Sequence, residues 1–188
     1  MTSLHKISAV IISFNEEKNI ERCLNSLDGV ADEIIVVDSF STDQTKSICE
    51  KHNVVFLEKP FEGYSDSKNW GNSKAQNEII LSLDADEALS DELRKNILKE
   101  KKNGLKKAYK MDRLNFISEK PLKFGGWYPD QKVRLFHKYF ANWNDKKVHE
   151  TVEVKQDVSI NYLEGDLLHY SFESNGDHLL TINKYSKI

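Results

Sequence analysis

Four short apolar runs, each followed by a segment with helical periodicity, restrict the folds that the first half of the chain can adopt. These runs cover residues 7–13, 33–38, 54–57 and 78–83. The first is apolar almost throughout, as expected of a strand that is covered on both faces. After it, Ile20, Cys23, Leu24 and Leu27 recur at helical spacing on one stripe. This alternation predicts an α/β fold with a mostly parallel central sheet flanked by helices.

Capping residues predict where the helices begin. Asn15 is placed to cap the first helix, and Ser41 opens a capping-box pattern ahead of the second. We expect the third helix to be weak and interrupted at Gly71, and the fourth to be capped by Ser90.

The second half of the chain has a different pattern. From residue 107 onward it contains short alternating segments with many aromatic residues, which predict antiparallel strands and loops packed beside the main sheet. The final segment, 177–188, has a helical pattern but no cap or glycine. We therefore expect a chain truncated at its C-terminus.

Bulk composition excludes several classes of protein. The formal net charge of -3 gives no general attraction to nucleic acid. Cys23 and Cys49 lack metal-site spacing and fall at apolar helix positions, so we expect reduced core thiols. No apolar run approaches the roughly 20 residues that span a bilayer. These features predict a cytoplasmic protein. The basic run at 94–107 leaves peripheral contact with the inner face of the cytoplasmic membrane open, beside the simpler interpretation of a solvated helix face.

Polar and acidic residues follow the predicted strands. In an open parallel sheet, ligands bind outside the carboxyl ends of the strands. The residues there are Phe14, Asn15 and Glu16, then Asp38, and then Asp84, Asp86 and Glu87. The chain has neither a glycine-rich dinucleotide fingerprint nor a phosphate-binding P-loop. A diphosphate bound at this edge would need another source of positive charge, and Mg²⁺ or Mn²⁺ suits carboxylate ligands.

Three segments of the first half carry a family resemblance. "AVIISFNEEKNIERCLNSL", "EIIVVDSFSTDQT" and "IILSLDADE" resemble the nucleotide-sugar motifs of family 2 inverting glycosyltransferases with the GT-A fold. "GGWYPDQKVRLF" and "VHETV" resemble a bacterial subgroup that adds a sugar, often glucose, to the inner core of lipopolysaccharide. The resemblance covers nearly the whole chain. It implies one domain over 1–188, with a nucleotide-sugar-binding half at 1–105 and a smaller acceptor-side half at 106–188.

The resemblance also implies roles for individual residues. Phe14, Asn15 and Glu16 would border the uracil and ribose, Asp38 would bind the base or ribose, Asp84 would touch the ribose, and Asp86 would be the main metal ligand, with Asp84 beside it. The chain departs from the pattern in having Ser39 where many relatives have an acid and Phe40 where glycine is common.

Three further residues have two interpretations each. Lys68 pairs with a donor phosphate or is a solvated helix lysine. Arg134 clamps the diphosphate or is a structural partner of Asp130. His169 is a further metal ligand or a core histidine with satisfied hydrogen bonds.

The catalytic base of an inverting transfer must lie opposite the leaving diphosphate. We expect it in the second half, with Glu150 as the first candidate, Asp130 as the second and His149 as a further one. A regular strand over 148–154 would set Glu150 among apolar neighbours, where it could also pair with Arg134.

The resulting hypothesis is a metal-dependent inverting glycosyltransferase. It would move a sugar, glucose from UDP-glucose, to a hydroxyl of a glycan or lipid-linked glycan in the lipopolysaccharide core or another cell-envelope glycan. The alternatives are a non-catalytic nucleotide-sugar-binding module and, with less support, an aspartyl-nucleophile phosphatase. The phosphatase motif requires a hydroxyl residue where this chain has Ala88.

Overall fold

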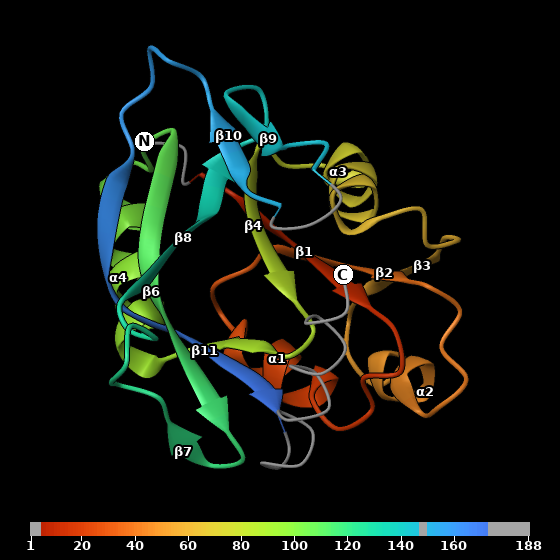
Figure 1. Cartoon of the computed structure of the whole chain (residues 1–188). Helices are drawn as coiled ribbons and strands as arrows, with labels where there is room; N and C mark the ends of the chain where they lie inside the picture. The colour runs from red at the N-terminus through yellow and green to blue at the C-terminus, as the bar shows by residue number, and fades with distance from the viewer. Residues whose placement is uncertain (1–4, 147–149, 173–188) are drawn as a thin grey trace.

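A computed structural model describes residues 5–146 and 150–172 of the chain. The first half contains the expected alternation (Figure 1). Its elements are β1 (Ile7–Ser13), α1 (Ile20–Ser26), β2 (Glu33–Asp38), α2 (Thr45–Cys49), β3 (Val55–Glu58), α3 (Tyr64–Lys74) and β4 (Ile79–Asp84). The remaining elements are β5 (Glu87–Leu89), α4 (Asp91–Asn103), β6 (Ala108–Ile117), β7 (Lys120–Pro121), β8 (Asp130–His137), β9 (Ala141–Trp143), β10 (Val152–Val154) and β11 (Asn161–Phe172).

One curled mixed sheet runs through both halves, in the order β3-β2-β1-β4-β8-β6-β11-β5. Strands β1 to β4 are parallel to one another, and β6 is parallel to β11, whereas β8 and β5 pair antiparallel with their neighbours. The predicted α/β fold with a largely parallel sheet is confirmed. The expectation that the second half lies beside this sheet is wrong, because β8, β6 and β11 continue it. Only β9 and β10, among the described strands, form a separate small antiparallel sheet.

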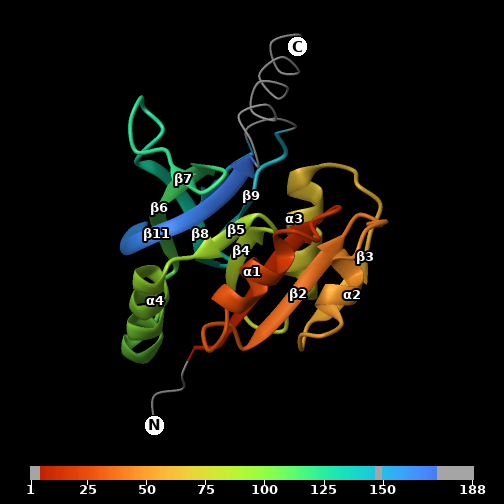
Figure 2. The ribbon, with the colours of Figure 1, turned by 90° about the horizontal axis from the view of Figure 1, so that it is seen from below.

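Helices cover both faces of the parallel part of the sheet, as Figure 2 shows from below. Apolar residues of α1, α2 and α4 pack against one face in a large core cluster, and α3 packs against the other. Gly71 does not interrupt α3, contrary to expectation. A Cβ atom at this position would lie 2.5 Å from Val10 Cγ1 and 2.9 Å from Val37 Cγ2. The missing side chain therefore lets α3 approach β1 and β2 closely.

Two of the predicted helix caps are wrong. Helix α1 begins after Asn19, and Asn15 instead adopts a φ of 54° in the loop before it. Its Oδ1 accepts a hydrogen bond from the Thr42 amide at 2.8 Å. Ser41 does not cap α2 either, because its hydroxyl donates to Asp38 Oδ1 at 2.6 Å. Ser41 Oγ also accepts a hydrogen bond from the Asn15 amide at 2.8 Å, so both side chains join the β1–α1 and β2–α2 loops instead of starting a helix.

Other local predictions are confirmed. Ser90 Oγ accepts a hydrogen bond from the Leu93 amide at 3.2 Å and so caps α4. Cys23 and Cys49 are free and buried. None of the described helices is long and apolar enough to cross a membrane. The predicted helix over 177–188 lies outside the described residues.

We predict that Gly71→Ala lowers the free energy of unfolding by about 1–3 kcal/mol, because the new methyl group overpacks the contact with Val10 and Val37. Helix propensity alone predicts the opposite sign. Chemical denaturation measures the change. Ser73→Ala, at an exposed position of the same helix, is the control and should change stability little. Equal or higher stability of Gly71→Ala would show that the helix can move away from the sheet at little cost.

Candidate active site

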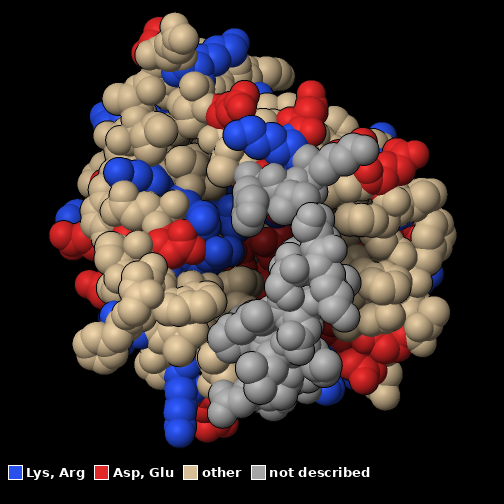
Figure 3. Space-filling model, in the orientation of Figure 1, with Lys and Arg blue, Asp and Glu red and all other residues tan. Residues whose placement is uncertain are grey.

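A cavity of about 650 Å³ lies where the carboxyl ends of β1 and β4 face β6, β8 and β11. Its volume is in the range of small-ligand sites. Most of the residues predicted for the site line it, namely Phe14, Glu16, Asp84, Asp86, Arg134, Glu150 and His169. Figure 3 shows basic side chains gathered beside a recess on this face, with acidic side chains inside it. The arrangement agrees with the rule that places ligands at the carboxyl ends of parallel strands.

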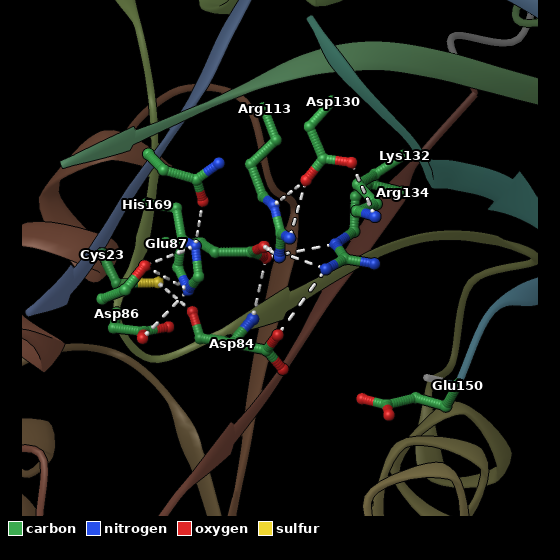
Figure 4. Close-up of polar contacts among 12 residues, drawn as sticks. Cys23, Asp84, Asp86, Glu87, Arg113, Asp130, Lys132, Arg134, Glu150 and His169 are labelled. Carbon is green, nitrogen blue, oxygen red and sulfur yellow. Dashed lines mark hydrogen bonds and ion pairs between the residues drawn. The ribbon is translucent and has the colours of Figure 1, made fainter. Parts of the chain in front are cut away.

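The centre of the site is an ion pair between Glu87 and Arg134 (Figure 4). The guanidinium donates from Nε to Oε2 at 3.1 Å and from Nη2 to Oε1 at 2.9 Å. Arg134 Nη2 also lies 3.6 Å from Asp84 Oδ2. On the other side of Glu87, Arg113 Nη1 lies 3.6 Å from Oε1, and Arg113 Nη2 donates to Asp130 Oδ2 at 2.7 Å. Charges of opposite sign therefore alternate across the sheet.

Two lysines extend this alternation at its ends. Lys68 Nζ lies 2.9 Å from Asp84 Oδ1 and 3.2 Å from Glu150 Oε1. Lys132 Nζ lies 2.8 Å from Asp130 Oδ1. We call the whole series the ion-pair chain, which in order consists of Glu150, Lys68, Asp84, Arg134, Glu87, Arg113, Asp130 and Lys132.

The two buried acids of the ion-pair chain are held ionised. Burial opposes ionisation of Asp84, but the charges of Lys68 and Arg134 outweigh it and lower the pKa of Asp84 well below its usual value. Burial likewise opposes ionisation of Glu87, and Arg134 again reverses the effect and lowers the pKa of Glu87. Both carboxylates are thus already matched by cations of the protein.

Asp86 has a different partner. Its Oδ2 lies 3.2 Å from Nε2 of His169, and both side chains line the cavity. Burial would lower the pKa of His169, but the hydrogen bond and negative charge of Asp86 raise it above its usual value. His169 Nδ1 lies 2.7 Å from Asn115 Oδ1. If Nδ1 donates its proton to Asn115, Nε2 is left to accept a proton or a metal beside Asp86.

These residues fit a divalent cation that draws most of its ligands from elsewhere. Among the described residues, no three His, Cys, Asp or Glu side chains gather around one metal position. Mg²⁺ usually takes one or two carboxylates from the protein and completes its shell with water and substrate phosphates. Asp86 meets that requirement, with the imidazole of His169 beside it, whereas Asp84 is occupied by Lys68 and Arg134.

Arg134 and Glu150 differ from their expected pairings. The structural partner of Arg134 is Glu87, with Asp84 beside it, and not Asp130. Glu150 lies before β10 and pairs with Lys68 instead of with Arg134. Residues 148–149 of the predicted strand, with the base candidate His149, lie outside the described residues.

Four of the predicted residues are not among the described residues that line the cavity. Lys68 is buried beneath it, with 1% of its surface exposed, so it is not a solvated helix lysine. Asp130 is held by Arg113 and Lys132. Asp38 accepts hydrogen bonds from Ser13 and Ser41 and fixes the loop after β2. Asn15 joins the two loops described above. The ligand roles of these residues remain predictions.

The cavity also contains residues that sequence reasoning missed. They include Phe61, Tyr64, Arg113, Lys132 and Trp143. The two aromatic rings of the β3–α3 segment pack edge to face, with centroids 5.0 Å apart, and are about half exposed. The position of Phe61 and Tyr64 after the third predicted strand could have indicated that they belong to the site. The sequence contained no signal for Arg113, because its ion pair with Glu87 depends on strand pairings between distant segments.

The architecture is that of GT-A glycosyltransferases. S. aureus TarS, residues 1–349, solved in complex with UDP-GlcNAc, superposes with a TM-score of 0.66 over 94% of this chain and 61% of that one. The two sequences are 18% identical over this alignment, so the likeness establishes the fold alone.

Sequence comparison defines the family. Residues 8–154 match the family model for glycosyl transferase family 2, so the chain belongs to this family of enzymes. An uncharacterized glycosyltransferase of Rickettsia felis is 34% identical over 97% of this chain and 68% of its own length. The lipopolysaccharide core biosynthesis glycosyltransferase LpsC of Rhizobium meliloti is 28% identical over 97% of this chain and 69% of its own. The chain thus spans about two thirds of these relatives.

We predict that Arg134→Met lowers the free energy of unfolding by about 3–5 kcal/mol, because it leaves the fully buried Glu87 without its main cation. Lys46→Met is the matched control, since it breaks the exposed pair with Glu58 and should cost less than about 1 kcal/mol. Urea denaturation of both variants gives the comparison. Similar small losses in both would mean that Glu87 is compensated without Arg134.

Proposed function

We propose that the chain is a metal-dependent inverting glycosyltransferase. It moves glucose from UDP-glucose to a hydroxyl of the lipopolysaccharide core or a related cell-envelope glycan. The observation that carries this proposal is that Asp86 and Glu150 line one cavity from different halves of the chain. In Figure 4 they lie on opposite sides of Asp84. Donor activation and acceptor deprotonation require groups on opposite faces of the reacting carbon, so this separation suits inversion.

Asp86 and His169 would hold the divalent cation, Mg²⁺ or Mn²⁺. The ion would stabilise the negative charge that develops on the leaving diphosphate. The raised pKa of His169 supports the pairing with Asp86, because a cation bound there replaces a proton that the pair otherwise holds. Asp84 would orient the ribose while Lys68 and Arg134 keep its carboxylate ionised.

Glu150 is the better candidate for the base. It lines the cavity and has a single cation, Lys68, within ion-pair distance among the described residues. Asp130 is bound by Lys132 and Arg113. Burial opposes its ionisation, but these two cations still lower the pKa of Asp130. A carboxylate held by two cations is a weak proton acceptor. Asp130 therefore acts as a structural member of the ion-pair chain.

The comparisons support the substrate classes in this proposal. TarS was solved with UDP-GlcNAc, and LpsC is named for lipopolysaccharide core biosynthesis. A uridine ring would bind near Phe14 and Glu16, which line the cavity at the end of β1. A lipid-linked acceptor fits an enzyme that works on the cytoplasmic side of the membrane. Exposed lysines of α4, such as Lys95 and Lys102, would contact anionic lipid.

We predict that Asp86→Asn removes the effect of Mn²⁺ on UDP binding while the fold stays intact. The wild-type protein should bind UDP more tightly with Mn²⁺ than with EDTA, and the variant should bind equally in both. Isothermal titration calorimetry measures this. Asp91→Asn, at an exposed acid of α4, is the control and should keep the wild-type response. Equal wild-type affinity with and without Mn²⁺ would contradict the metal assignment.

We predict that Glu150→Gln lowers glucosyl transfer by about 10²-fold or more, because it keeps the shape of the side chain and removes the base. Donor affinity should stay within a few-fold. UDP release and the anomeric configuration of the product, read by NMR, are the measurements. Asp130→Asn is the comparison and should retain more transfer than Glu150→Gln. The reverse ranking would assign the base to Asp130, and a product of retained configuration would refute inversion.

A further inference from the structure

Lys68 has an unusual environment for a lysine of a helix. Its side chain is 1% exposed and its ammonium lies between two carboxylates that come from different halves of the chain. Asp84 ends β4, and Glu150 precedes β10. Trp143 covers the ammonium, with its ring centroid 4.0 Å from Nζ. Lys68 therefore touches the donor side and the acceptor side of the cavity at once without lining it.

Trp143 is itself held in place by three contacts. Its indole Nε1 donates to Ser82 Oγ in β4 at 3.1 Å. Its backbone amide and carbonyl both bond the side chain of Asn69, the residue after Lys68 in α3. Helix α3 and the small β9–β10 sheet are thus joined around the ammonium. This packing holds Lys68 Nζ in one position relative to both carboxylates.

The two carboxylates depend on Lys68 to different degrees. Asp84 has a second cation, since Arg134 Nη2 lies 3.6 Å away. Among the described residues, Glu150 has no cation other than Lys68 within ion-pair distance. Loss of the Lys68 charge would leave Asp84 compensated and would release Glu150. The effect should therefore fall on the acceptor side of the reaction.

A buried ion pair adds little net stability, because desolvation of the two charges offsets their attraction. The main effect of this contact is geometric. Lys68 holds Oε1 of Glu150 and leaves Oε2 to meet an acceptor hydroxyl. A base must lie within about 2.6–3.2 Å of the proton that it removes, so fixing one oxygen orients the other.

We propose that Lys68 is a positioning residue, which links Asp84 on the donor side to Glu150 on the acceptor side and orients the catalytic carboxylate. This inference rests on the proposed function, since it takes Glu150 as the base. It assigns to Lys68 a role under the cavity in place of a contact with the donor phosphates.

The experiment measures kcat and KM for the hydrolysis of UDP-glucose with Mn²⁺, in which water takes the glucosyl group and UDP is released. Lys68→Met should lower kcat by about tenfold, as expected for loss of a charge-assisted hydrogen bond, and leave KM within about threefold. Lys68→Arg keeps the charge and should recover part of the lost kcat. A rise in KM with unchanged kcat would overturn the inference and return Lys68 to donor binding.

A double variant separates positioning from simple structural damage. In the Glu150→Gln background, Lys68→Met should lower kcat by less than about twofold further, because the group that it orients is already gone. If the two substitutions instead lower kcat by independent factors that multiply in the double variant, the inference is overturned. Lys101→Met is the matched control, because Lys101 is also buried and ion-paired, with Asp32, but lies away from the cavity. It should lower thermal stability and leave kcat unchanged.

Two further outcomes are decisive. If Lys68→Met does not fold, as judged by circular dichroism, Lys68→Gln replaces it, since it keeps a polar end group without the charge. If the wild-type protein releases no UDP while still binding it, the proposed function fails, and the role of Lys68 fails with it. A normal wild-type rate together with a normal Lys68→Met rate refutes the positioning role alone.

Discussion

The ion pair between Glu87 and Arg134 is the interaction on which the rest of the site depends. Glu87 begins β5, which the chain reaches directly after β4, and Arg134 lies in β8, from the second half. Glu87 is 0% exposed, so its charge requires a partner at a fixed position. That partner is available only when β8 pairs beside β4. The ion pair therefore forms only in the correct strand order, and the same strand order sets the geometry of the cavity.

This pair also explains why three acids follow one buried strand. Asp84 ends β4, Glu87 begins β5, and the turn between them carries Asp86. The amide of Asp84 donates to Oε2 of Glu87 at 3.1 Å, so Glu87 closes the turn as well as binding Arg134. Repulsion among the acids is relieved by basic partners. Arg134 serves both Asp84 and Glu87, Lys68 adds a second cation for Asp84, and His169 pairs with Asp86. Of these three acids, Asp86 faces the cavity paired only with His169, as far as the described part of the chain shows.

The sequence predicted the first half well because its signals are local. Apolar periodicity located β1 to β4 and the four helices, and the residues after the strands gave much of the cavity lining. The second half was predicted poorly because the places of β6, β8 and β11 in the sheet depend on pairings between distant segments. Local capping rules failed for Asn15 and Ser41, whose side chains bond a neighbouring loop instead. The contacts of Glu87 with Arg113 and Arg134 were missed because they too depend on pairings between distant segments.

Charge balance gives an independent argument for a metal. In the ion-pair chain, four carboxylates are matched by four cations, so these four basic side chains carry no surplus positive charge. A diphosphate that approached Arg134 or Lys68 would have to compete with Asp84 and Glu87 for them. Displacing such a buried pair leaves an uncompensated charge and costs several kcal/mol. Asp86 and His169 lie outside the ion-pair chain but line the same cavity. A divalent cation bound there would add positive charge that the described residues do not supply, which supports placing the diphosphate on that side and the acceptor beside Glu150.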